Sequence, residues 1–410
     1  MKLIRRFLLL QLIFLLFETI SCREELLGYD QAINPIWERN FNVGLTGGIQ
    51  PIVHDNIVLF ASLLEKSQDL SVNEKLIALD KESGDLIWEW NDHFRPEYQH
   101  FSSNAASLKP ISNDKLAFTF GGRNFCVNLN TGGTVWKNMN DNSTSRDDLV
   151  NLGEMLFRTD IVDGENTDRL MEADFNTGIW KPVYEVNGGD SIRQGLQVPA
   201  FYFESDGDTI MIFSNTLWDH TTNKIIPRLI SYNKTRDSTY YDIQLDDEPD
   251  LWSAVDWIPI IKDDMVFLSV DDHMHCRNVK TGELIWKRNL KMNLLSSNFI
   301  IEGDRLFTNT EEPRLWCLDT ETGHVLWDIP SFGFASLLNY YDHKIIYSGW
   351  GLLRIVDADS GAVLAEIKAP SSYKNSDHDF SSRCTVDPET GNIYVTSWTT
   401  AYCYPPYEAK

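Results

Sequence analysis

The sequence predicts an all-β protein, and three observations specify the fold class as an eight-bladed β-propeller. A phrase of the form Asx-x-x-(Ser/Thr)-Gly-x-x-x-Trp recurs along the chain. Each copy lies between short apolar segments that are joined by polar turns, which indicates four strands per repeat. The strand that is missing from the last repeat is found near the N-terminus. Four-stranded units repeated radially form a propeller.

The repeated phrase predicts a β-hairpin whose returning strand carries a large ring. An Asx side chain can accept hydrogen bonds from backbone two residues on, which begins the turn. The Gly supplies a positive φ, and the Trp can fill the gap between neighbouring sheets. Two copies are partial, because Trp180 comes two residues early and Ala365 replaces a Trp. The predicted repeat residues are Asp80, Gly84, Trp88, Gly132, Trp136, Gly178, Trp180, Gly282, Trp286, Asp319, Gly323, Trp327 and Gly361.

Counting the copies predicts eight blades of four antiparallel strands. Blade 4 is degenerate, because Ser231–Arg236 lacks the Gly. Since blades 3 and 4 are weak, seven blades is the alternative. The first seven blades are expected at 49–90, 105–139, 148–183, 196–245, 255–290, 297–329 and 335–367.

Blade 8 begins near Arg383 and runs out of chain after its third strand. Ile36–Phe41 matches Ile285–Leu290 in four of six positions. The strand around Trp37 is therefore expected to complete blade 8 and close the ring, which removes an exposed sheet edge.

The N-terminus has the charge order of a secretory signal. Lys2, Arg5 and Arg6 precede an apolar stretch at 7–17, which is shorter than the about 20 residues that a membrane span needs. Small residues before Cys22 suggest a lipoprotein cleavage site, although Thr19 stands where Leu is common. We expect a signal peptide at 1–21, a lipidated Cys22 with a tether at 22–32, and a single propeller domain at 33–410.

The charge balance restricts the class of partner. Lys and Arg number 36 against 60 Asp and Glu, and the resulting net charge of −24 argues against nucleic acid and anionic membrane surfaces as partners. A monomeric propeller that contacts neutral or cationic surfaces is expected.

Four cysteines fall at equivalent places in their blades, namely Cys126, Cys276, Cys317 and Cys403, while blade 1 has Ala78 there. A position that takes Ala or Cys favours a small buried group. Equivalent points on different blades are too far apart for a disulfide, so none is expected among the four. The one conceivable pair is Cys384 with Cys403. The chain has no haem-attachment or zinc spacing of cysteines.

Candidate chemistry outside the repeat is sparse. Asp271–His275 could bind a metal through its acids and two histidines, but a solvated hairpin explains the segment as well. The chain has no nucleophile-elbow motif. We therefore predict no catalytic, cofactor or metal residues. Four tryptophans outside the phrase are possible interface anchors, with burial between blades as the alternative: Trp252, Trp257, Trp350 and Trp398.

The phrase resembles the repeat of the quinoprotein-dehydrogenase-like (PQQ-like) family, Ala-x-Asp-x-x-x-Gly-x-x-x-Trp, and Ala78–Trp88 is its closest copy here. That family includes enzymes and pure binding scaffolds. The resemblance implies that an enzyme would carry an adjacent-cysteine disulfide over its quinone and ligands for calcium. This chain has no adjacent cysteine pair. At fold level it is also similar to the lipoprotein scaffold subunit of the outer-membrane β-barrel assembly machine.

These observations favour a non-enzymatic lipoprotein of the cell envelope that acts as a protein-interaction scaffold, with outer-membrane protein assembly as the implied setting. The expected location is the outer membrane of a Gram-negative bacterium, with periplasmic and surface orientations both open. The alternative function is a small-ligand-binding or quinone-dependent oxidoreductase propeller that uses the axial funnel.

Overall fold

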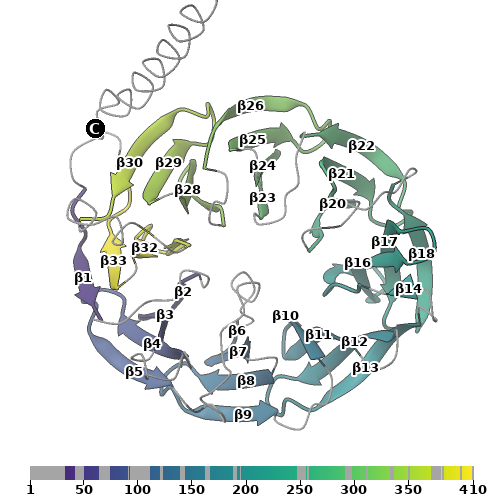
Figure 1. The fold of residues 1–410 in the computed structure, drawn as a ribbon, viewed down its shortest axis with the longest axis horizontal. Helices are drawn as coiled ribbons and strands as arrows, with labels where there is room; N and C mark the ends of the chain where they lie inside the picture. The colour runs from purple at the N-terminus through teal and green to yellow at the C-terminus, as the bar shows by residue number, and fades with distance from the viewer. Residues whose placement is uncertain are drawn as a thin grey trace, which may run out of the picture.

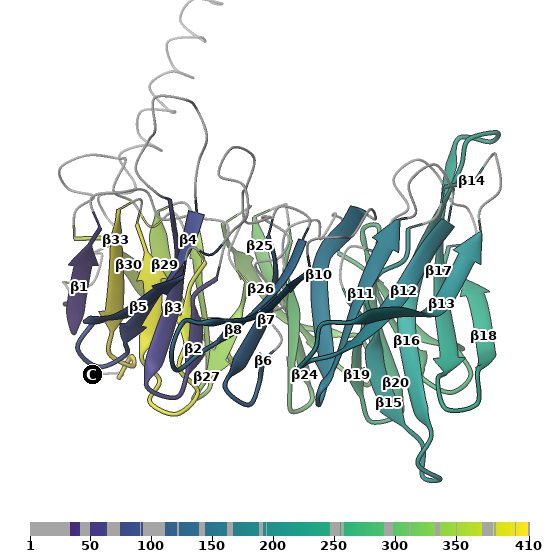
Figure 2. The same cartoon turned by 90° about the horizontal axis from the view of Figure 1, so that it is seen from below.

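The described chain is a closed ring of antiparallel sheets (Figure 1). Viewed from the side, the ring is a flat disc, with the strands crossing its thickness (Figure 2). Among the described residues, no helix is long and apolar enough to cross a membrane. The structure is a computed structural model, which describes residues 33–41, 50–63, 74–90, 92, 111–120, 123–138, 144–161, 167–187, 192–193, 195–246, 255, 258–290, 298–310, 313–332, 337–349, 351–370, 380, 383–397 and 399–408.

Blades 1 to 4 follow one another along the first half of the chain. Their strands are β2 (Ile52–His54), β3 (Ile57–Leu63), β4 (Glu74–Asp80) and β5 (Leu86–Trp90) in blade 1; β6 (Ile111–Ser112), β7 (Lys115–Phe120), β8 (Arg123–Asn128) and β9 (Thr134–Asn138) in blade 2; β10 (Thr144–Leu152), β11 (Met155–Ile161), β12 (Thr167–Asp174) and β13 (Trp180–Asn187) in blade 3; and β14 (Ile192–Arg193), β15 (Ala200–Phe203), β16 (Thr209–Asp219), β17 (Lys224–Asn233) and β18 (Ser238–Gln244) in blade 4.

Blades 5 to 8 complete the ring. Their strands are β19 (Ile260–Lys262), β20 (Met265–Val270), β21 (His273–Asn278) and β22 (Leu284–Asn289) in blade 5; β23 (Phe299–Glu302), β24 (Arg305–Thr310), β25 (Arg314–Asp319) and β26 (Val325–Pro330) in blade 6; β27 (Asn339–Tyr341), β28 (Lys344–Gly349), β29 (Leu352–Asp357) and β30 (Val363–Lys368) in blade 7; and β31 (Thr385–Val386), β32 (Ile393–Thr396), β33 (Thr400–Tyr404) and β1 (Trp37–Asn40) in blade 8.

The strand order confirms the prediction of eight blades over the alternative of seven. Seven sheets have four strands, and blade 4 has a fifth, because β14 and β15 both pair with β16. Short turns separate neighbouring strands, as expected for antiparallel meanders. The apolar side chains of each blade pack against those of the next, so the core lies between the blades.

The predicted closure of the ring by the N-terminal strand is confirmed. β1 pairs antiparallel with β33, and Trp37 stands opposite Cys403. The backbone N–H of Ile36 donates to the Cys403 carbonyl at 2.7 Å. A second tie between blades 8 and 1 is the Lys81 ammonium, which lies 3.1 Å from the buried carboxylate of Asp387. Segments from the two ends of the chain therefore hold one blade together.

The predicted turn chemistry is present at each clear copy of the phrase. In blade 1 the Asp80 carboxylate accepts hydrogen bonds from the N–H groups of Glu82 at 3.0 Å and Ser83 at 2.8 Å. Gly84 has a φ of +73°, which an L side chain rarely adopts. These hydrogen bonds lower the pKa of Asp80, chiefly through the backbone of Ser83.

Five of the repeat glycines also receive the indole of the preceding blade. A Cβ at Gly84 would stand 2.6 Å from Cδ2 of Trp37, which no real contact tolerates. The Trp37 Nε1–H donates to the Lys81 carbonyl at 3.1 Å, inside the same turn. The same arrangement joins Trp88 to Gly132, Trp136 to Gly178, Trp286 to Gly323 and Trp327 to Gly361. The Gly is therefore required by the turn and by the joint between blades.

The joints that lack this tryptophan use other rings. At Gly282 the contacts come from Tyr241 and Ile243 of blade 4, and the Tyr241 hydroxyl donates to the Val279 carbonyl at 3.1 Å. Trp180, the early copy, makes its ring contact within blade 3, where the Arg158 guanidinium lies over it, 4.3 Å from the ring centre. Blade 4 is thus held differently from its regular neighbours.

The cysteine prediction is confirmed. None of the described cysteines, Cys384 and Cys403 included, forms a disulfide, and all five are buried. Cys317 stands directly across the strand pair from Trp327. Burial raises the pKa of the Cys317 thiol to about 12, so it remains protonated. The position beneath the tryptophan therefore requires a small apolar group, as in the Ala78–Trp88 pair of blade 1. The other cysteines opposite a tryptophan are Cys126, Cys276 and Cys403.

Candidate functional site

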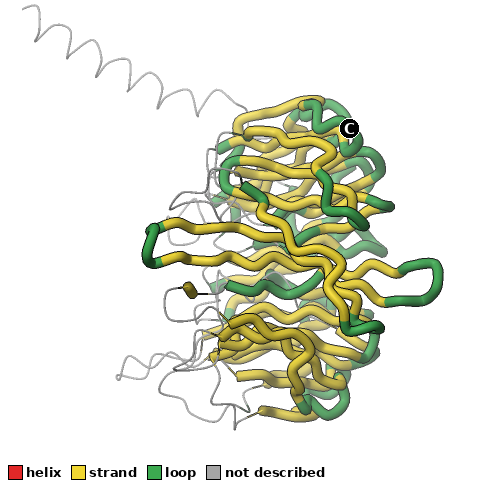
Figure 3. The backbone as a smooth tube through the Cα atoms, turned by 90° about the vertical axis from the view of Figure 1, so that its right-hand side faces the viewer, coloured by secondary structure: helices red, strands yellow, loops and turns green. Residues whose placement is uncertain are grey.

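Blade 4 is the part of the disc that departs most from the repeat. β16 and β17 are 11 and 10 residues long, whereas β20 and β21 of blade 5 have 6 each. The long hairpin projects from one face of the disc, and the turn between β15 and β16 projects from the other (Figures 2 and 3). Projections of this kind offer a partner surface that the flat disc lacks.

The tip of the β16–β17 hairpin is a hydrogen-bonded turn with an aromatic residue beside it. The Asp219 carboxylate accepts from the hydroxyls of Thr221 at 2.6 Å and Thr222 at 2.7 Å. These bonds, the Thr221 hydroxyl first, lower the pKa of Asp219 to about 2. Trp218 is 38% exposed and packs against the imidazole of His220, with ring centres 4.5 Å apart. β14 pairs with this end of β16, which adds a third strand to the projection.

The opposite end of blade 4 carries a charged cluster. The guanidinium of Arg236 bonds the carboxylates of Asp206 and Asp208, and Asp208 raises the pKa of Arg236 more than any other group. The Asn233 amide donates to Asp208 at 2.6 Å. Because arginine and amide groups already engage these carboxylates, the cluster is suited to a polar protein contact and poorly suited to a cation.

Two aromatic residues border this cluster. Phe203 is 57% exposed, and Tyr240 is 38% exposed with its hydroxyl donating to Glu204 at 3.0 Å. Exposed aromatic rings next to a fixed polar network are typical of binding surfaces. We name Trp218, His220, Phe203, Tyr240 and Arg236 the blade 4 surface, and it spans both ends of the blade.

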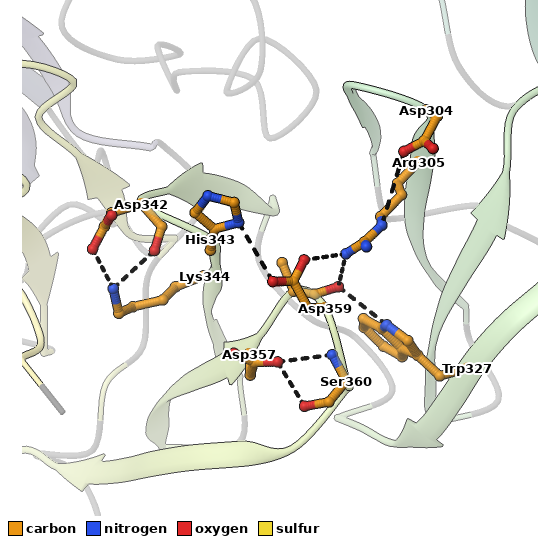
Figure 4. Close-up of polar contacts among 10 residues, drawn as sticks. Asp304, Arg305, Trp327, Asp342, His343, Lys344, Asp357, Asp359 and Ser360 are labelled. Atoms are coloured by element: carbon orange, nitrogen blue, oxygen red, sulfur yellow. Dashed lines mark hydrogen bonds and ion pairs between the residues drawn. The ribbon is translucent and has the colours of Figure 1, made fainter.

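A regular blade shows the contrast (Figure 4). In blade 7 the Asp359 carboxylate faces His343, whose Nδ1 is 3.5 Å away, and also bonds the Arg305 guanidinium. The Ser360 hydroxyl donates to Asp357 at 2.6 Å. Asp357 also accepts the backbone N–H of Ser360 at 2.7 Å, and its pKa is lowered, first by the Ser360 hydroxyl, so this carboxylate is a weak base. The Arg305–Asp359 contact joins blades 6 and 7.

The predicted interface tryptophans cannot be placed, because Trp252, Trp257, Trp350 and Trp398 lie outside the described residues. The same holds for Cys22 and the rest of the first 32 residues. Sequence reasoning missed Phe203 and Tyr240. The sequence feature that could have pointed to these two residues is the degeneracy of blade 4, whose strands contain aromatic residues but lack the repeated phrase.

Comparison with known proteins identifies the family. A family model described as outer membrane protein assembly factor BamB matches residues 23–154 and 270–364, which together make up more than half of the chain. The chain belongs to this family. The interval between the two matched segments holds all of blade 4 and three strands of blade 3. The BamB-family signal is therefore interrupted where the projections occur.

Curated BamB proteins match a limited part of this BamB-family chain. BamB of Salmonella typhimurium is 27% identical over 129 residues, and BamB of Escherichia coli is 26% identical over 129 residues. Each alignment covers 30% of this chain and 32% of the relative. The chain thus spans about a third of the length of the curated relatives that it matches.

Solved structures match nearly the whole ring. BamB from Moraxella catarrhalis has a TM-score of 0.58 at 10% identity, covering 92% of this chain and 98% of that one. A europium-containing methanol dehydrogenase has a TM-score of 0.60 at 12% identity, covering 88% and 84%. The quinohemoprotein alcohol dehydrogenase of Comamonas testosteroni has a TM-score of 0.62 at 10% identity, covering 91% and 76%. This BamB-family chain therefore shares its PQQ-like propeller fold with a solved BamB and with two dehydrogenases.

Proposed function

We propose that this protein is a non-enzymatic scaffold of outer-membrane protein assembly, anchored by a lipid at Cys22, and that blade 4 holds its partner. The observation that carries the proposal is the match to the BamB family on both sides of a blade that leaves the repeat and projects from both faces. In a repeat protein the regular units supply the framework, so the irregular unit is the natural place for a specific contact.

The chemistry of the described turns supports a binding role over a catalytic one. The repeat carboxylates accept backbone and hydroxyl hydrogen bonds, as Asp319 does from Thr322 and Asp357 does from Ser360. The cysteines opposite the tryptophans have pKa values of about 12 because of burial. Carboxylates that already accept hydrogen bonds are poor general bases, and protonated thiols are poor nucleophiles.

The blade 4 surface is suited to a protein partner for a physical reason. Its turns are held by side-chain hydrogen bonds at both ends, so a partner that docks there orders few additional side chains. Preorganisation of this kind reduces the free-energy cost of association. Trp218 and Phe203 supply exposed apolar area, and Arg236 and its carboxylates supply polar specificity.

Site-specific cross-linking from the full-length, membrane-anchored protein tests the proposal. A photo-cross-linker at Trp218 or Phe203 should capture an envelope protein involved in outer-membrane assembly. The same group at Ile87, an exposed apolar residue on the outer strand of regular blade 1, is the matched control and should capture far less. Trp218→Ala and Phe203→Ala should reduce recovery of the captured partner at least tenfold.

Two outcomes would overturn this function. One is equal capture from blades 1 and 4, and the other is unchanged recovery with both alanine variants folded. The anchor is tested separately by metabolic labelling with a fatty acid. Incorporation should disappear in Cys22→Ala, and labelling that persists would place the lipid elsewhere or exclude it.

A quinone-dependent oxidoreductase is the second candidate, favoured by the fold shared with methanol and alcohol dehydrogenases. It predicts that added pyrroloquinoline quinone binds the purified protein and supports reduction of a dye by an alcohol. The scaffold proposal predicts no turnover above the level of free quinone. Turnover together with failed cross-linking would replace the scaffold by the enzyme.

A further inference from the structure

The β20–β21 hairpin of blade 5 brings together three potential metal ligands. Asp271 and Asp272 form the turn, and His273 begins β21. One ligand atom from each residue lies within 4.8 Å of the others. Carboxylate oxygens and an imidazole nitrogen form a mixed donor set that suits a transition metal better than calcium or magnesium, which prefer oxygen alone.

A polar hydrogen-bond donor already bridges two of these ligands. The Asn289 side-chain amide lies 2.9 Å from Oδ2 of Asp272 and 3.1 Å from Nε2 of His273. A cation placed where this amide nitrogen lies would be near both Oδ2 of Asp272 and Nε2 of His273. Rotation of the amide by half a turn would direct its carbonyl oxygen to the same point, which adds a further oxygen ligand from β22.

An independent observation on the same face of β21 indicates that the cluster serves a ligand. His275 is 1% exposed, and neither of its ring nitrogens has a hydrogen-bond partner. A neutral imidazole keeps a lone pair that can bind a metal ion. An unsatisfied buried polar group costs free energy, and metal coordination would recover that cost.

The two imidazoles lie slightly farther apart than two rings that bind one ion. The ring centres of His273 and His275 lie 6.3 Å apart, with their planes at 75°. Since a nitrogen–zinc bond is about 2.0–2.1 Å long, two imidazoles on one ion have centres about 5–6 Å apart. His275 is not among the residues whose ligand atoms lie within 4.8 Å of one another, so a side-chain rotation must bring its imidazole to the ion.

We propose that Asp271, Asp272, His273 and His275 bind a divalent transition-metal ion of the zinc class, with Asn289 as a neighbouring ligand or support. The negative charge of Asp246, which follows the last strand of blade 4, favours positive charge at His273, whereas the positive charge of Lys287 disfavours it. The proposal is independent of the scaffold function.

Metal titration of the untagged, full-length protein tests this site. Isothermal titration with Zn²⁺, and with Co²⁺ read by its visible absorption, should show one saturable site. His273→Gln and Asp272→Asn should weaken binding at least tenfold. His343→Gln is the matched control, because His343 also faces an aspartate but lies in a turn on the opposite face of the disc. It should leave binding unchanged.

A second measurement covers variants that fail to fold. Zn²⁺ should raise the melting temperature of the wild-type protein, since a ligand that binds only the native state stabilises it. His275→Leu, which replaces the buried imidazole with an apolar group, should fold and lose this shift. The site is refuted by the lack of saturable binding, or by binding that folded His273→Gln and His275→Leu variants retain.

Discussion

The indole of Trp37, in the N-terminal strand, lies against Gly84 of blade 1, and a Cβ on Gly84 would stand 2.6 Å from its Cδ2 atom. The indole N–H donates to Lys81 in the same turn. This contact fastens the strand that closes the ring to the blade that follows it. The stability of the closed ring therefore depends on a glycine that no side chain can replace.

Gly84→Ala should destabilise the protein more than Gly303→Ala. Both glycines have a positive φ, of +73° and +55°, so both variants incur the same kind of backbone strain of about 1–2 kcal/mol. Gly303 has nothing within 4 Å of an added Cβ, whereas Gly84→Ala also collides with Trp37. Overpacking adds about 1–3 kcal/mol. Urea unfolding measures the difference, and equal losses of stability would contradict the double role of Gly84.

Cys317→Ala should be tolerated, whereas Cys317→Leu should not. Cys317 is buried opposite Trp327, and the equivalent residue of blade 1 is Ala78 opposite Trp88. The alanine variant should change the free energy of unfolding by less than about 1.5 kcal/mol. The leucine variant should lose about 1–3 kcal/mol by displacing the indole.

Alkylation provides the companion measurement for the buried thiols. With pKa values of about 12, Cys126, Cys276, Cys317 and Cys403 should resist iodoacetamide at pH 8 in the native protein and react once urea exposes them. Rapid modification of the native protein would show that these positions open to solvent.

Acid should destabilise the wild-type protein more than the double variant Asp319→Asn/Asp357→Asn. Hydrogen bonds, first from the hydroxyls of Thr322 and Ser360, lower the pKa values of these two carboxyls. Because the unfolded value is about 3.9, each carboxylate stabilises the fold above about pH 4, and this contribution is lost as the pH falls toward the folded-state pKa. Melting temperatures between pH 6 and pH 3 measure the effect.

An amide at these positions should preserve the turn. Asn128 accepts the same backbone hydrogen bond in blade 2, so the double variant should keep the wild-type fold at pH 7. Glu321→Gln, at an exposed position beside Asp319, removes a charge from the same turn and is the control. An acid response of the double variant that equals the wild type would refute the role of the Asx carboxylates.

Tyr241→Phe should cost more than Tyr240→Phe. The Tyr241 hydroxyl donates to the Val279 carbonyl across the joint between blades 4 and 5, and its loss should lower the free energy of unfolding by about 0.5–1.5 kcal/mol. The Tyr240 hydroxyl meets Glu204 at the exposed surface, so its removal should have a smaller effect on stability. Denaturant unfolding of the two neighbouring variants distinguishes a structural hydroxyl from a surface one.

The sequence predicted the repeated parts of the fold because their causes are local. The Asx turn, the positive φ of Gly84 and the returning strand depend on residues within one hairpin. Even the long-range closure by Trp37 could be predicted, since Ile36–Phe41 copies an outer strand elsewhere in the chain. The cysteine positions followed from the same alignment.

The blade 4 surface could not be predicted in this way. Its strands lack the phrase, so no copy elsewhere indicated that β16 and β17 would lengthen or that β14 would join them. Arg236 lies 30 residues from Asp206, and Tyr240 lies 36 residues from Glu204, so these side chains meet only when β15 to β18 pair.

The sequence by itself determined the propeller and the strand that closes the ring, because each follows from a repeated local pattern. The strand pairing decided between eight blades and seven. Tertiary structure alone decided which residue each indole meets. Trp37 is placed on Gly84 and Tyr241 on Gly282 by the packing of one blade against the next. The same packing left His275 buried without a hydrogen-bond partner. Such contacts join residues of different repeats, so no single repeat contains the information.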